Sequence, residues 1–113
     1  MKVKVFEGDT LIGEATIFAL DPPMCVAMAK FEPTFGYYAA RHANVIAGDY
    51  VGDRTDILRI EMWDGTPMKS EAISIQDFSE INERQLDLIG IYEPSFDELF
   101  NDHPSFKQYW RPQ

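Results

Sequence analysis

Alternation of apolar and polar residues predicts strands along the first third of the chain. Lys2 to Phe6 alternates lysine with valine, and Thr10 to Leu20 resumes as a strand after the turn residues Glu7-Gly8-Asp9. This pattern is typical of a β-hairpin with one wet face. Asp21-Pro22-Pro23 ends the second strand, because proline cannot donate to a ladder. Met24 to Glu32 is predicted as a third strand.

A central helix and a second group of strands follow. Thr34 to Gly48 spaces its apolar residues like one face of a helix, with Thr34 as N-cap and Gly48 as the C-terminal glycine. Ile57 to Trp63 and Met68 to Ile75 are predicted as an antiparallel pair around an Asp-Gly-Thr-Pro turn. After an ambiguous turn, Gln85 to Tyr92 is predicted as a further strand.

The C-terminal segment is predicted to be helical. Ser95 and Glu98 form a capping box for a short helix that runs through Phe100. Pro104 can open a second short helix whose aromatic residues would hold it on the sheet: Phe106, Tyr109 and Trp110. Residues 1–113 are therefore predicted to form a single α+β domain, with no internal repeat. Its expected parts are a mostly antiparallel sheet of about five or six strands, one packed central helix and a short helical C-terminal tail.

Composition narrows the class of protein. The chain has 113 residues, of which 45% are hydrophobic, and this is ordinary for a globular domain. No apolar run approaches the roughly 20 residues that a membrane helix needs, and the alternating N-terminus does not resemble a signal peptide. Cys25 is the only cysteine, which suits a reducing environment. We therefore expect a cytoplasmic protein without membrane contact.

The acidic charge indicates which partners to expect. The formal net charge is −9, and from Glu71 to Asp102 there are nine acidic residues against the single Arg84. Such a surface repels phosphate backbones, so a nucleic-acid partner is excluded. It would attract a basic protein partner, and Tyr37 and Tyr50, which we expect to be exposed, could serve as binding anchors.

Cys25 and His42 are the candidate catalytic residues. On the predicted helix one face would point inward, made of Phe35, Tyr38, Ala39, His42, Val45 and Ile46. The opposite face would carry Tyr37, Arg41 and Asn44. An inward imidazole one element after a thiol could act as general base for a cysteine nucleophile. The two side chains could equally be unrelated members of the core.

Neither a third catalytic group nor a cofactor site is evident. Asn44 would lie on the wrong helix face to orient His42, whereas Glu14, Glu32 and Asp49 are possible orienting groups whose position relative to His42 the sequence does not give. Cysteine and histidine do not have the spacing of metal ligands, and the glycines form no phosphate-binding loop. We therefore predict no metal and no cofactor.

Two stretches and one pattern carry a resemblance. LDPPM at Leu20 to Met24 and FEPTFGYY at Phe31 to Tyr38 resemble segments of small uncharacterised bacterial α+β proteins. The chain also has a lone cysteine and an inward histidine surrounded by the small residues Ala27, Ala29, Ala39 and Ala43. This pattern resembles that of computationally designed cysteine esterases. The resemblance implies an engineered ester hydrolase for small activated esters, with Cys25 as nucleophile and His42 as base. The alternative is a non-catalytic acidic binding module, of inhibitor or immunity type, for a basic protein partner.

Overall fold

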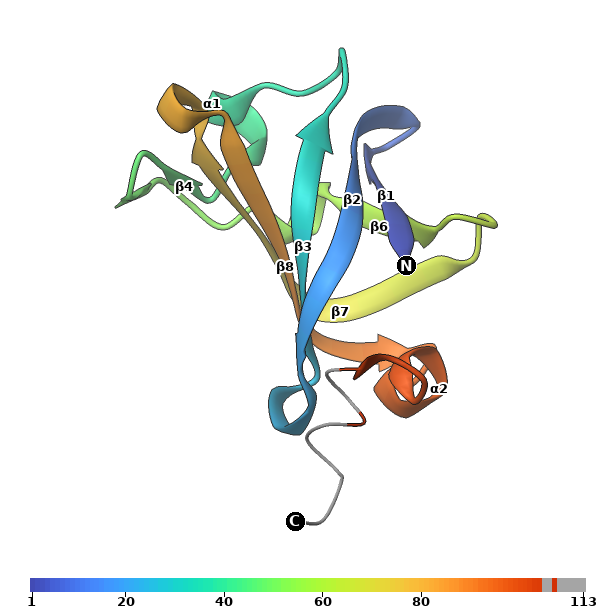
Figure 1. The fold of residues 1–113 in the computed structure, drawn as a ribbon. Helices are drawn as coiled ribbons and strands as arrows, with labels where there is room; N and C mark the ends of the chain where they lie inside the picture. Colours follow the sequence, from blue (N-terminus) through green and yellow to red (C-terminus); the bar gives the residue numbers. More distant parts are fainter. Residues whose placement is uncertain (105–106, 108–113) are drawn as a thin grey trace.

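Six antiparallel strands pair around a closed ring in the computed structural model of this protein, which describes residues 1–104 and 107 (Figure 1). Along the ring the order is β7-β6-β1-β2-β3-β8, and β8 pairs again with β7 to close the barrel. The bounds are Lys2–Glu7 for β1, Thr10–Asp21 for β2, Val26–Pro33 for β3, Arg59–Met62 for β6, Pro67–Phe78 for β7 and Glu83–Glu93 for β8.

Short elements connect and flank these strands. They are η1 (Pro22–Met24), α1 (Ala39–His42), β4 (Val45–Ile46), β5 (Asp49–Tyr50), η2 (Thr55–Ile57), η3 (Ser79–Ile81) and α2 (Phe96–Phe100), where η denotes a 3-10 helix. β4 pairs in parallel with β7, and β5 pairs with β4 outside the barrel. Among the described residues, no helix has the length and apolar character needed to span a membrane.

The prediction of an α+β fold with a packed central helix is wrong, because the molecule is a mostly β barrel. The individual strands lie where alternation and β-rich composition predicted them, within a few residues at each end. A sheet that closes on itself buries its own apolar face, so it needs no helix to cover that face. The strands supply the most deeply buried side chains, among them Val3, Val5, Ile12, Ala27, Ala29, Ile75, Leu86 and Leu88.

The predicted helix over 34–48 shrinks to the four residues of α1 because its first part is pinned to β2. The hydroxyl of Thr34 donates to the carbonyl oxygen of Leu11 at 2.7 Å. Gly36 packs so tightly there that a Cβ atom would lie 2.9 Å from the same oxygen. The helical pattern therefore misassigned several faces. Phe35 and Tyr38 are exposed instead of inward, whereas half-buried Tyr37 packs against the core.

The connection after β2 and the connection after β7 have the same form, although no internal repeat was predicted. β2 and β7 each have 12 residues and each ends in a three-residue 3-10 helix. A left-handed residue follows each helix: Cys25 (φ 54°, ψ 43°) after η1 and Asn82 (φ 55°, ψ 41°) after η3. Asparagine tolerates this conformation well, whereas cysteine adopts it rarely. The two connections lie at opposite ends of the barrel (Figure 1).

The predicted start of α2 at Ser95 is confirmed, but the Oε1 atom of Glu98 accepts from the Ser95 hydroxyl at 3.0 Å and not from the Ser95 backbone N–H, as the predicted capping box would require. The Oγ atom of Ser95 accepts from the backbone N–H of Glu98 at 3.2 Å. The second predicted C-terminal helix cannot be compared in full, because Phe106, Tyr109 and Trp110 lie outside the described residues.

Asn44 completes the pairing of β7 where strand partners are missing. Its amide donates to the carbonyl oxygen of Ile73 at 3.3 Å, and its side-chain oxygen accepts from the N–H of Ile75 at 3.1 Å. Asn44 is buried, not exposed as the helical pattern predicted. The side chain therefore acts as a short substitute for a neighbouring strand.

We expect Asn44→Ala to lower the free energy of unfolding by about 1–3 kcal/mol, because it leaves buried backbone groups of β7 unpaired. The measurement is urea unfolding followed by circular dichroism. Asn101→Ala is the matched control: this exposed side chain makes no hydrogen bond with another described residue, so the change should stay within about 0.5 kcal/mol. Equal effects of the two substitutions would contradict the bridging role.

Candidate functional site

Cys25 and His42 lie near opposite ends of the barrel. Cys25 immediately precedes β3, and its carbonyl oxygen accepts from the N–H of Ile91 at 3.0 Å. His42 belongs to α1, beyond the other end of β3 (Figure 1). Eight residues of strand rise by roughly 25 Å. The structure therefore does not bring the thiol and the imidazole together, and a direct proton transfer between them has no path.

Both ring nitrogens of His42 are engaged, and the side chain is only 1% exposed. The backbone N–H of Tyr38 donates to Nδ1 at 3.0 Å, so this nitrogen carries no proton. Nε2 therefore carries it and faces Oε1 of Glu7 at 2.7 Å. These contacts fasten the start of α1 to the end of β1. His42 thus has a structural role in the barrel, consistent with the prediction that its side chain points inward.

Glu7 is the anion of this cluster. Its carboxylate accepts from Nε of Arg41 at 2.7 Å and from a terminal guanidinium nitrogen of the same residue. The hydrogen bonds from Arg41 and then from His42 lower the pKa of Glu7 to about 2. The carboxylate is therefore ionised throughout the neutral range, and the end of β1 stays tied to α1.

A second cluster continues from His42 toward the β7–β8 connection. The ring of His42 stacks on Tyr37, with the ring centroids 5.7 Å apart. The hydroxyl of Tyr37 donates to Oδ2 of Asp77 at 2.6 Å, and Nε of Arg84 donates to the same oxygen at 3.1 Å. Burial and the hydrogen bond to Asp77 raise the pKa of Tyr37 well above its usual range. Asp77 therefore holds both a phenol and a guanidinium in fixed positions.

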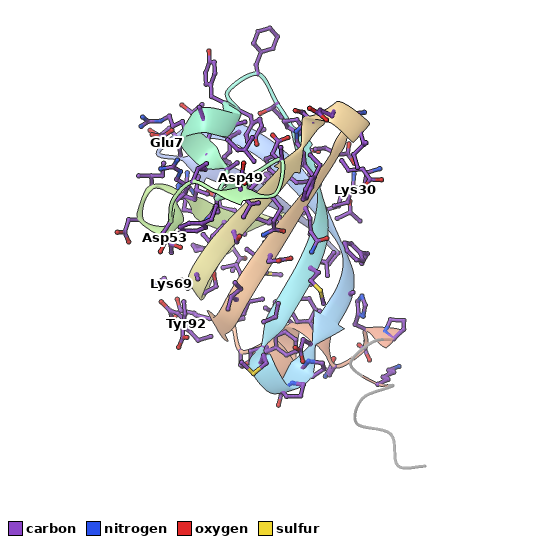
Figure 2. The ribbon with its side chains drawn as sticks, turned by 90° about the vertical axis from the view of Figure 1, so that its left-hand side faces the viewer. Glu7, Lys30, Asp49, Asp53, Lys69 and Tyr92 are labelled. Carbon is purple, nitrogen blue, oxygen red and sulfur yellow. The ribbon has the colours of Figure 1, made fainter. Side chains whose placement is uncertain are left out.

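Arg84 reaches a surface groove of about 640 Å³ beside this cluster. We call it the hairpin groove; its lining includes Phe18, Lys30, Gln76, Phe78, Ile81 and Gln85. Three of these residues are apolar yet exposed: Phe18 by 55%, Phe78 by 39% and Ile81 by 66%. Figure 2 shows Lys30 on the side of the barrel away from Glu7. The groove is the candidate functional site, because large exposed apolar side chains that gather in a concavity mark binding surfaces.

The strands place the groove residues through their register. Gln76 on β7 pairs with Gln85 on β8, which in turn pairs with Lys30 on β3, so a polar row crosses three strands. Phe18 is the extra residue of a β-bulge, because Ile17 and Ala19 pair with consecutive residues of β3. A bulge turns its side chain away from the regular pleat. Phe18 therefore stands at one wall of the groove.

Sequence reasoning did not identify the hairpin groove. The available signal was weak: Phe18, Phe78 and Ile81 are large apolar residues near positions where turns or alternation break. Only strand pairing brings a residue of β2 beside the β7–β8 connection. Of the predicted anchors, Tyr50 is exposed, whereas half-buried Tyr37 belongs to the Asp77 cluster.

Comparisons with protein-family models, curated proteins and solved structures find no match to this chain. The resemblance to designed cysteine esterases therefore stays a prediction that no relative tests.

The low pKa of Glu7 predicts a specific acid dependence of stability. A carboxylate whose pKa falls from 4.5 to about 2 on folding stabilises the native state fully above about pH 4.5. That contribution is lost as the pH drops through about 2. Glu7→Gln should therefore lower the urea midpoint at pH 6, and this loss should shrink steadily toward pH 2. Glu80→Gln, at an exposed carboxylate outside any described ion pair, should show no such convergence.

Because Cys25 and His42 lie far apart, the reactivity of the Cys25 thiol should not depend on His42. The rate of Cys25 alkylation by iodoacetamide should follow the same pH profile in the native protein and in folded His42→Gln. Circular dichroism checks that the variant is folded. A shifted profile in the variant would show that the two groups are coupled.

Proposed function

We propose that this protein is a non-catalytic binding module that captures a basic protein partner in the hairpin groove. Two features support the proposal: an excess of carboxylates over the surface, and exposed apolar side chains gathered in one concavity. The first attracts a partner over distance, and the second holds it on contact.

The carboxylates are mostly uncompensated. Five of the 19 acidic side chains form an ion pair with a described lysine or arginine, and the other 14 do not. The acidic run from Glu71 to Asp102 covers most of β7, all of β8 and α2. Both of these strands contribute residues to the hairpin groove. A basic partner would thus be drawn toward the face that contains the groove.

The groove supplies the short-range part of binding. Phe18 and Phe78 expose phenyl rings. Contact of such rings with apolar side chains and with cations is energetically favourable. The single observation that carries the proposal is this grouping of exposed Phe18, Phe78 and Ile81 in a hollow of a strongly acidic molecule.

Two capped peptides of opposite charge test the proposal by fluorescence anisotropy: acetyl-Lys-Arg-Phe-Lys-Arg-Gly-amide and acetyl-Glu-Asp-Phe-Glu-Asp-Gly-amide, each labelled with fluorescein. We expect the basic peptide to bind at about 20 mM salt and to weaken by about tenfold or more toward about 500 mM, because salt screens exposed charges. The acidic peptide should not bind.

Matched substitutions separate groove binding from general charge attraction. Phe78→Ser should lower the affinity for the basic peptide several-fold. Met24→Ser removes an apolar side chain that is more exposed than Phe78 and lies at the opposite end of the barrel, and it should have no effect on binding. Equal affinities for the two peptides, or equal losses in the two variants, would contradict the proposed function.

A further inference from the structure

Lys30 differs from every other described cation. The remaining described lysines and arginines each have an ion pair, a hydrogen bond or an aromatic ring beside them. Lys30 has no such contact among the described residues, and its exposed side chain lines the hairpin groove. An ammonium group beside exposed phenyl rings is suited to an anion that carries an apolar part.

The two glutamines of the polar row present hydrogen-bond acceptors beside this ammonium group. Nε2 of Gln76 donates to Oγ of Ser74 at 2.6 Å, and Nε2 of Gln85 donates to Oδ1 of Asp87 at 2.8 Å. Both amide nitrogens are thus directed along their strands. The two side-chain oxygens have no partner among the described residues, so they can accept from the backbone N–H groups of a peptide.

The groove also has a negative end. Glu83 lines it and lies two residues before Gln85 on the same face of β8, roughly 7 Å along the strand. Gln85 is the residue that pairs with Lys30. Glu83 forms no ion pair with a described cation. A positive and a negative group therefore lie on the neighbouring strands β3 and β8, offset by two residues, and the exposed side chains of Phe18 and Phe78 flank them on β2 and β7.

From this arrangement, and resting on the proposed function, we infer that the hairpin groove binds the free carboxyl terminus of the basic partner. The terminal carboxylate lies against the ammonium of Lys30, and the terminal apolar side chain lies between Phe18 and Phe78. A basic penultimate side chain faces Glu83. Recognition of a chain end in this way gives specificity that surface charge alone does not.

Three peptides test the inference by fluorescence anisotropy at about 50 mM salt. The first is acetyl-Lys-Arg-Gly-Lys-Leu with a free carboxylate, the second is the same peptide with a C-terminal amide, and the third is the isomer acetyl-Lys-Arg-Lys-Gly-Leu with a free carboxylate. The fluorophore replaces the acetyl group in each. The amide is the more cationic peptide, so attraction to an acidic surface alone favours it.

We expect the free carboxylate to bind about fivefold more tightly than the amide, and more tightly than its isomer. Lys30→Gln should abolish the preference for the carboxylate, because the substitution removes the only described ammonium in the groove. Lys69→Gln is the matched control: Lys69 pairs with Glu93 at 3.2 Å, away from the groove, and the preference should persist. Glu83→Gln should abolish the preference between the two isomers.

Each contrary outcome has a distinct meaning. If the amide binds as tightly as the carboxylate while both still depend on Phe78, the inference is wrong and the proposed function stands. If neither peptide binds in a groove-dependent way, both are wrong. If hexanoate alone binds the groove as tightly as the free peptide, the site recognises small carboxylic acids and the assignment to a peptide end is overturned.

Discussion

Strand β7 pairs with β6 at its start, with β8 along its length and with β4 near its end, and the closed barrel depends on these contacts. Without the β7–β8 pairing the six strands would form an open sheet with two long edges. Closure turns the apolar face of every strand toward the same interior, which explains why so little helix is needed. Where β7 lacks a strand partner, the side chains of Asn44 and Thr55 form hydrogen bonds with its backbone groups.

Asp77, near the end of β7, connects the barrel strands to the loop before α1. It holds Tyr37 from the loop before α1 and Arg84 from β8, and Tyr37 in turn supports the ring of His42. Both of its hydrogen bonds use one carboxylate oxygen. The other oxygen is buried with no hydrogen-bond partner among the described residues. Moving Tyr37 or Arg84 away would leave this buried carboxyl group with still fewer hydrogen bonds, and that loss would be destabilising. The cluster therefore requires the loop, β7 and β8 to stay in one arrangement, and this arrangement keeps the groove wall in place.

Charge and shape have different roles on this molecule. The excess of carboxylates acts over a distance of about 10 Å at 0.1 M salt, so it would affect how often the proposed basic partner arrives. In the proposed function, the hairpin groove would act only on contact, through Phe18, Phe78 and the opposed charges of Lys30 and Glu83. An acidic surface by itself attracts many cations, whereas a groove with a positive and a negative end selects among them.

Much of the local structure follows from the sequence alone, because strands and caps depend on neighbouring residues. Alternation and β-rich composition located the six barrel strands, and Ser95 with Glu98 located the start of α2. Helical periodicity was misleading over 34–48, because contacts with Leu11 on β2 outweigh the local preference. The inward direction of His42 was predicted correctly, but its partners were not. Neither Glu7 nor Tyr38 could be assigned to it before the strands were paired.

The tertiary structure alone decided which side chains meet. Cys25 and His42 are separated because β3 runs the length of the barrel between them. Lys30, Gln85 and Gln76 form one row because three strands align in a particular register. A shift of one residue in that register would turn each of these side chains to the other face. The sequence thus determined where strands form and how acidic the surface is, because these are properties of single segments and of composition. The barrel and its groove depend on pairing between distant segments, which no local pattern encodes.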